Sequence, residues 1–89
     1  MKLNENYILR TVAGSDVVVA VGKEAAKLRG MMNLNDTAAF IWRCLEKGFD
    51  EEKIIEKLKE EYTGADDKTL RLEVQTFLDK LINMGIVQK

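Results

Sequence analysis

Apolar residues follow two different patterns along this chain, and the change between them falls near residue 35. Before that point they gather in two short runs rich in β-branched residues, 7–12 and 17–21, which are typical of strands. The turn-forming residues 13–16 between the runs predict a β-hairpin. Because the run 17–21 is apolar at every position, we expect both of its faces to be covered, as in the central strand of a small sheet.

A third short strand is predicted at residues 31–34, Met31-Met32-Asn33-Leu34. The segment before it, 22–30, fits either a short helical turn or an irregular loop. Adjacent strand residues point to opposite faces, so we expect only one of Met31 and Met32 to face the core. A long connection before this strand and a helix after it indicate a position at the sheet edge. One row of its backbone donors and acceptors would then be unpaired.

From residue 35 onward, apolar residues recur at helical spacing in three segments. We expect the first helix to be capped by Asn35 or Asp36, the second by Asp50, and the third by Asp66 or Asp67. The expected core-facing stripes are Ala38, Ile41, Trp42 and Leu45; Ile54, Ile55, Leu58 and Tyr62; and Leu70, Val74, Phe77, Leu78 and Leu81, with Met84 at one side of the last.

Together these elements predict one α+β domain over residues 1–89, because a chain this short cannot build two cores. A three-stranded antiparallel sheet, about residues 7–34, precedes three helices, about residues 35–84. The order is similar to a winged helix-turn-helix. Residues 86–87 either add a short closing strand or simply pack on the core.

Composition narrows the classes of function. A net charge of −1 disfavours general attraction to nucleic acid or to anionic membranes. No apolar run approaches the roughly 18 residues that span a bilayer, and the first residues lack the apolar core of a signal peptide. The single cysteine, Cys44, cannot form an internal disulfide, which favours a reducing compartment. We therefore expect a cytoplasmic protein with no membrane or nucleic-acid partner.

Residues suited to catalysis are few. The sequence contains no histidine, the commonest general base and metal ligand, and Cys44 falls within a helical stripe, where it is expected to be buried filler. No glycine-rich phosphate-binding motif is present. The acidic residues at the helix starts are explained by capping and by the helix dipole. We therefore predict that the protein is not an enzyme, with no catalytic, cofactor-binding or metal-ligating residue.

Two kinds of recognition remain open. One is a winged-helix module that binds DNA or a regulatory protein, although segment 66–84 carries only three cations against four acids, which works against docking on phosphates. The other is peptide binding, which needs a free strand edge and an adjacent apolar groove. Besides these two, the protein could be a purely structural subunit.

On a helical wheel, one flank of the third helix borders its core stripe. This flank is a candidate groove wall beside the third strand, and its members are Arg71, Gln75, Leu78 and Ile82. Alternatively, Leu78 and Ile82 belong to the core while Arg71 and Gln75 are solvated. Periodicity by itself favours this second interpretation.

The start of the first helix resembles the family of coenzyme PQQ synthesis protein D, the PqqD-like proteins. The residues that carry the resemblance there are Leu34-Asn35-Asp36-Thr37-Ala38-Ala39-Phe40-Ile41-Trp42. Order and spacing continue to match through Gly48-Phe49-Asp50-Glu51-Glu52-Lys53-Ile54-Ile55, Glu60-Glu61-Tyr62, Val74-Gln75-Thr76-Phe77-Leu78-Asp79-Lys80-Leu81 and Gly85-Ile86-Val87. The resemblance covers almost the whole chain, from Tyr7 to Val87.

This resemblance implies a three-stranded sheet followed by three helices. It also implies a non-catalytic recognition element that holds the leader of a ribosomally made precursor peptide and presents it to a modifying enzyme, often a radical S-adenosylmethionine protein. The leader would add as a strand beside Met31, Met32, Asn33 and Leu34, and its side chains would meet the flank Arg71, Gln75, Leu78 and Ile82. The resemblance is compatible with a monomer or a homodimer and leaves the product open, PQQ included.

Overall fold

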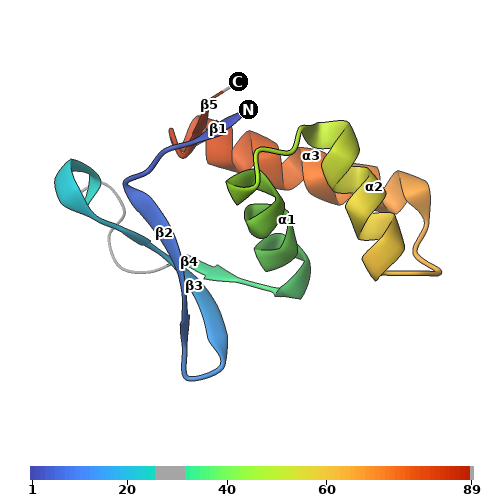
Figure 1. Ribbon diagram of the computed structural model, residues 1–89, viewed down its shortest axis with the longest axis horizontal. Helices are drawn as coiled ribbons and strands as arrows, with labels where there is room; N and C mark the ends of the chain where they lie inside the picture. The colour runs from blue at the N-terminus through green and yellow to red at the C-terminus, as the bar shows by residue number, and fades with distance from the viewer. Residues whose placement is uncertain (26–31, 89) are drawn as a thin grey trace.

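The computed structural model describes residues 1–25 and 32–88 as an α+β chain (Figure 1). In order, the elements are β1 (Lys2–Leu3), β2 (Tyr7–Val12), β3 (Ser15–Ala20), the short 3-10 helix η1 (Gly22–Glu24), β4 (Met32–Leu34), α1 (Asp36–Glu46), α2 (Glu51–Glu61), α3 (Asp67–Asn83) and β5 (Val87–Gln88). The predicted fold class is thereby confirmed. Residues 26–30 and Met31, the first residue of the predicted third strand, lie outside the described part.

The main sheet is antiparallel with strand order β2-β3-β4, so β3 is central and β4 is an edge strand, as predicted. Two neighbouring residues of β3, Val17 and Val18, are 3% and 0% exposed. Because they point to opposite faces, both faces of β3 are covered. Ala13 and Gly14 connect β2 to β3 with φ angles of 51° and 81°, the positive pair that a type I′ hairpin turn requires.

A second, two-stranded sheet was not predicted from the sequence. β1 pairs antiparallel with β5, which places Lys2 opposite Gln88 and Leu3 opposite Val87. The two ends of the described chain consequently lie side by side (Figure 1). Of the two interpretations of residues 86–87, both hold in part, because Val87 belongs to the strand while Ile86 and Val87 are buried.

Each of the three α-helices begins where a polar side chain caps it. The Asn35 side-chain oxygen accepts a hydrogen bond from the Ala38 N–H at 2.8 Å, and Asp50 accepts one from the Lys53 N–H at 2.9 Å. Asp66, rather than Asp67, caps α3 through the Thr69 N–H at 3.3 Å. These bonds satisfy N–H groups that have no partner inside the helix, which explains why the helices start at these residues.

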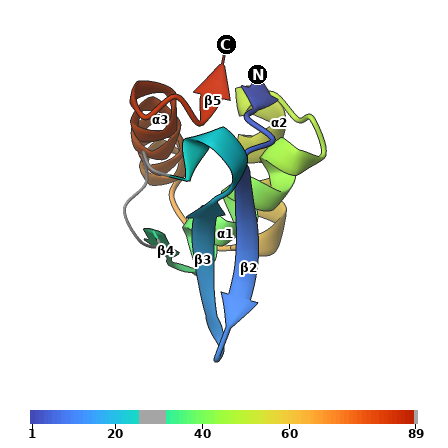
Figure 2. The ribbon, with the colours of Figure 1, turned by 90° about the vertical axis from the view of Figure 1, so that its left-hand side faces the viewer.

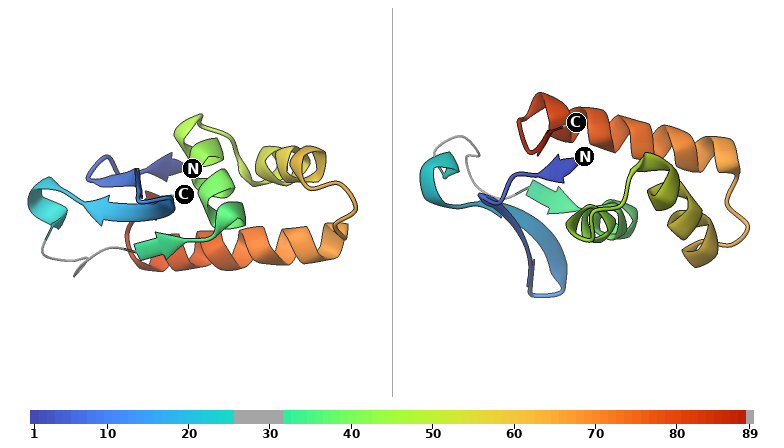
Figure 3. Two further views of the ribbon diagram at one scale, coloured as in Figure 1. Left: turned by 90° about the horizontal axis from the view of Figure 1, so that it is seen from below. Right: turned by 45° about the horizontal axis from the view of Figure 1, so that its top comes forward.

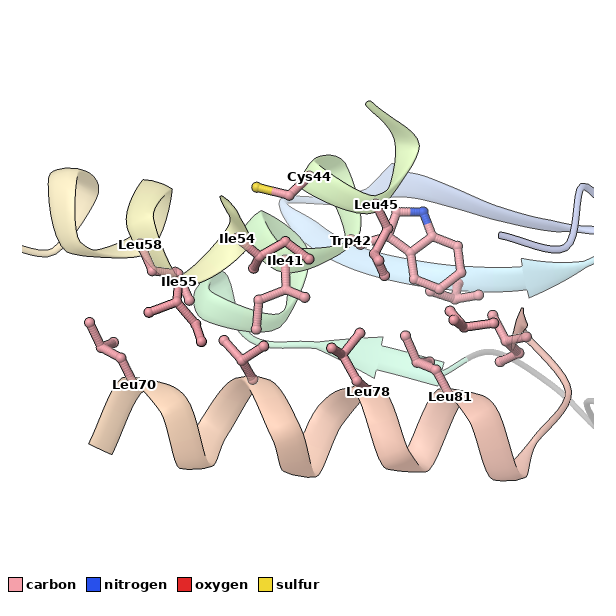
Figure 4. Packing of buried hydrophobic residues seen from close by; sticks show 14 of the residues in the cluster. Ile41, Trp42, Cys44, Leu45, Ile54, Ile55, Leu58, Leu70, Leu78 and Leu81 are labelled. Carbon is pink, nitrogen blue, oxygen red and sulfur yellow. The ribbon is translucent and has the colours of Figure 1, made fainter. Parts of the chain in front are cut away.

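The core lies where the three helical stripes meet the inner face of the main sheet (Figures 2 and 4). Trp42 is completely buried in it, and Cys44 is buried as expected at 4% exposure. Burial raises the pKa of the Cys44 thiol, although Lys47 and Lys57 oppose this shift. Met84 is 37% exposed, so its predicted place beside the α3 stripe is wrong. The reason is that α3 ends at Asn83 and the chain turns away at Gly85, which has a φ of 76°.

None of the helices within residues 1–25 and 32–88 is long and apolar enough to cross a membrane.

Candidate peptide-binding site

β4 offers a free strand edge. One side of it pairs with β3, which places Met32 opposite Val18, Asn33 opposite Val17 and Leu34 opposite Asp16. No strand in the described part of the chain pairs with its other side. The free side lies at the same end of the main sheet as α3, while β2 lies at the opposite end (Figure 2).

The hairpin register identifies which backbone groups of β4 point outward. Facing residues in an antiparallel pair alternate between hydrogen-bonded and non-hydrogen-bonded pairs. The Val21 N–H, directly after β3, donates to the Asn6 carbonyl at 2.7 Å, so Val21 and Asn6 form a hydrogen-bonded pair. Every second residue of β3 counted back from Val21, which includes Val17, therefore bonds to β2. The intervening residues of β3 therefore bond to β4.

It follows that Met32 and Leu34 direct their backbone groups toward β3. Asn33 stands opposite Val17 in a non-hydrogen-bonded pair, so its N–H and C=O point away from the sheet. Met32 and Leu34 meanwhile pack partly buried against the core, whereas the Asn33 side chain is exposed. Asn33 thus presents one donor and one acceptor to an incoming strand.

A groove of about 400 Å³ begins directly after β4. One wall comes from the residue that follows β4 and the first turns of α1, and the other wall comes from one flank of α3. The lining residues are Asn35, Thr37, Ala38 and Ile41 on the first wall and Leu72, Glu73, Thr76, Phe77 and Lys80 on the second. α3 and β4 run in opposite directions (Figures 1 and 3), and the groove lies between α1 and α3 and starts at the residue that follows β4.

The predicted flank of α3 lies on the other side of this helix. Arg71 reaches toward α2, where its Nη1 lies 2.8 Å from Glu52 Oε1, and its Nε lies 2.9 Å from Asp67 Oδ2. Leu78 is buried at 3% exposure, and together with Ile82 it lines a separate pocket beside Met1. The expectation that these residues form a groove beside the third strand is therefore corrected.

The fourth member of that flank, Gln75, is exposed and lines none of the pockets described above. The helical wheel indicates the wrong flank because a core stripe has a border on each side, and the spacing of apolar residues does not distinguish the two borders. Only the position of β4 relative to α3 shows which border is next to the strand. Contact of Arg71, Gln75, Leu78 and Ile82 with a ligand stays a prediction without support from this geometry.

Leu72 is the groove residue that the sequence interpretation overlooked. It is 64% exposed, the most exposed large apolar side chain in the described part of the chain. Leu72 is 200° from Leu70 at 100° per residue, far outside the core stripe. An apolar residue so far from the stripe was the available signal. Phe77, which was assigned to the core, is half-buried and contributes to both the core and the groove.

Charges on the two flanks of α3 differ in their pairing. On the α2 side, Lys59 pairs with Asp67, and Arg71 pairs with both Asp67 and Glu52. Hydrogen bonds from Lys59 and Arg71 lower the pKa of the Asp67 carboxyl, and Glu52 and Asp67 raise the pKa of Arg71. On the groove side, neither Glu73 nor Lys80 forms an ion pair with any residue that the structure describes.

Within residues 1–25 and 32–88, no group of three or more acidic, cysteine or histidine side chains is placed to hold a metal ion. The arrangement that the structure does provide is a strand edge continued by a partly apolar groove. Such a surface can bind an extended chain through backbone hydrogen bonds and side-chain contacts.

The model of the family described as coenzyme PQQ synthesis protein D (PqqD) matches residues 17–87. A search of curated proteins finds no match.

Two solved structures are similar to this chain over 99% of its length. The one described as TbiB1 in complex with the TbiA(beta) leader peptide is 22% identical, with a TM-score of 0.80 and 95% of that chain covered. The one described as lasso peptide synthetase B1 complexed with the leader peptide is 19% identical, with a TM-score of 0.77 and 96% covered. At these identities the two similarities establish a shared fold.

Proposed function

This chain belongs to the coenzyme PQQ synthesis protein D (PqqD) family, and we propose that it captures the leader of a precursor peptide as an added strand on β4. The observation that carries the proposal is the outward-facing N–H and C=O of Asn33, two residues before Asn35 in the wall of the groove between α1 and α3. The two similar solved structures are both described as complexes with leader peptides, which supports the same class of ligand.

In this mechanism the leader pairs with β4 and places its side chains in the groove. Backbone hydrogen bonds contribute affinity with little dependence on sequence, while Leu72, Phe77 and Ala38 select apolar side chains. The protein carries out no covalent step itself. It raises the local concentration of the precursor at a modifying enzyme, for which a radical S-adenosylmethionine protein is the partner that the family resemblance implies.

The charge of the groove does not favour nucleic acid as the ligand. Its lining includes one acid, Glu73, and one base, Lys80, so it offers no net attraction to phosphate groups. A peptide needs no such excess of cations. The winged-helix alternative that binds DNA is therefore less well supported than peptide binding.

Replacing Asn33 with proline tests strand addition directly. Proline removes the outward N–H and places its ring where the ligand backbone would pair, yet an outward-facing edge position tolerates it in the folded protein. One lost hydrogen bond corresponds to about 1 kcal/mol, so we expect leader affinity to fall at least about fivefold. Fluorescence anisotropy with leader peptides encoded near the gene measures this loss.

Asn33→Ala is the matched control, because it keeps the N–H and removes only the exposed side chain. Wild-type affinity in both variants, each shown to be folded by circular dichroism, would refute strand addition at β4. Amide NMR shifts in the wild type add a second check. We expect shifts at residues 32–34 and at the groove wall of α3, and shifts confined to the Arg71 flank would place the peptide elsewhere.

A further inference from the structure

Glu73 and Lys80 are two exposed and unpaired charges of opposite sign in the wall of the groove. They lie seven residues apart and therefore on the same face of α3. Their neighbours on that face, one turn along the helix from each of them, are Thr76 and Phe77, which carry no charge. Neither charge therefore has an intrahelical partner at the usual spacing of three or four residues.

The opposite flank of α3 shows how this protein treats charges that serve the fold. There Arg71 and Asp67 join α2 to α3 through ion pairs with Glu52 and Lys59. Lys80, in the last turn of α3, also suits the negative end of the helix dipole, but Glu73 in the helix interior has no such explanation. The two groove charges are thus available to a ligand.

Their spacing matches an extended peptide. Seven residues of helix span about 10 Å at 1.5 Å per residue. In a strand, side chains on one face recur every second residue, and positions i and i+4 are about 13 Å apart. The long Glu and Lys side chains can bridge the difference of about 3 Å. A ligand with charges at i and i+4 would then place its middle residue, i+2, against Phe77.

The order of these charges sets a direction. β4 and α3 run in opposite directions (Figure 3), and Lys80 follows Glu73 along α3. Antiparallel pairing is the more stable mode of strand addition. A ligand strand antiparallel to β4 runs parallel to α3, with its N-terminal side near Glu73 and its C-terminal side near Lys80.

We propose that Glu73 and Lys80 fix the direction and register of the bound peptide by selecting a basic residue, an apolar residue two positions later, and an acidic residue four positions later. This inference rests on the proposed function, because it requires that the groove holds an extended peptide. It adds a property that strand addition does not supply, since backbone hydrogen bonds alone do not discriminate between the two charge orders.

Two synthetic peptides of identical composition provide the test. Both are fluorescein-labelled 11-residue chains with capped ends; one has Lys-Thr-Leu-Thr-Glu at its centre and the other has Glu-Thr-Leu-Thr-Lys. We expect the wild-type protein to bind the first about fivefold to tenfold more tightly in 50 mM salt, with the preference shrinking in 500 mM salt. The double variant E73K/K80E, which keeps the net charge, should reverse the preference.

The control variant K57E/E60K exchanges the members of an ion pair on α2, away from the groove, and should keep the wild-type preference. Equal binding of both peptides, with amide shifts in the groove, would overturn the charge selection and leave the proposed function standing. A wild-type preference for the second peptide would overturn the assigned direction. No binding of either peptide at 1 mM would count against both the selection and the groove as a peptide site.

Discussion

Replacing Leu72 with alanine separates binding from folding. Leu72 is 64% exposed and lies in the groove wall on α3. The free protein therefore gains little from burying this side chain, and alanine is at least as good a helix former as leucine. We expect the free energy of unfolding to change by no more than about 0.5 kcal/mol.

The effect on peptide binding is expected to be larger, because a peptide bound in the groove covers the Leu72 side chain that the free protein exposes. Complete burial of a leucine side chain stabilises by about 1.5–3 kcal/mol. Because Leu72 is 64% exposed, roughly two thirds of this free energy remains to be gained when a peptide covers it. Alanine keeps part of the contact, so Leu72→Ala should weaken the binding free energy by about 1 kcal/mol. At 1.4 kcal/mol per factor of ten, the dissociation constant should rise about fivefold.

Fluorescence anisotropy with a leader peptide, together with urea unfolding of the free protein, measures both quantities. Val12→Ala is the matched control, because Val12 is 49% exposed at the hairpin end of β2 and does not line the groove. We expect V12A to bind as the wild type does. Unchanged affinity in L72A, or an equal loss in V12A, would refute the assignment of Leu72 to the ligand surface.

Two further predictions concern the fold. Ala13→Asn should stabilise the protein by about 0.5–1 kcal/mol, because Ala13 has a φ of 51°, a conformation that asparagine tolerates better than alanine. An unchanged or lower urea midpoint would contradict this prediction. Asp67→Asn tests the ion pairs between α2 and α3. Lys59 and Arg71 lower the pKa of the Asp67 carboxyl in the folded protein. The contribution of Asp67 to stability is therefore fully present above its unfolded-state pKa near 4 and is lost as the pH falls through its lower folded-state pKa. Urea unfolding between pH 5 and pH 2 should therefore show a steeper loss for the wild type than for D67N, and parallel curves would count against the pairing.

Local chemistry in the sequence was enough for much of this fold. The β-branched runs, the turn and the capping residues each act over a few neighbouring positions, so they could be interpreted without tertiary information. The predicted turn 13–16 is two residues shorter in the structure, because Ser15 and Asp16 already belong to β3. The helical stripes likewise identified most of the core, including Trp42. The free edge was predicted from chain order, from the long connection before the strand and the helix after it.

Tertiary structure decided what depends on residues far apart in the chain. β1 and β5 are only two residues each, and neither has a recognisable strand pattern until the two chain ends meet. The outward direction of the Asn33 backbone follows from its register with β3, which no local pattern determines. The groove wall was placed on the wrong border of α3 for the same kind of reason. A helical wheel shows which residues border the core, but only the tertiary arrangement of α3 and α1 brings Leu72, Phe77 and Lys80 into the groove that begins after β4 and leaves Arg71 against α2.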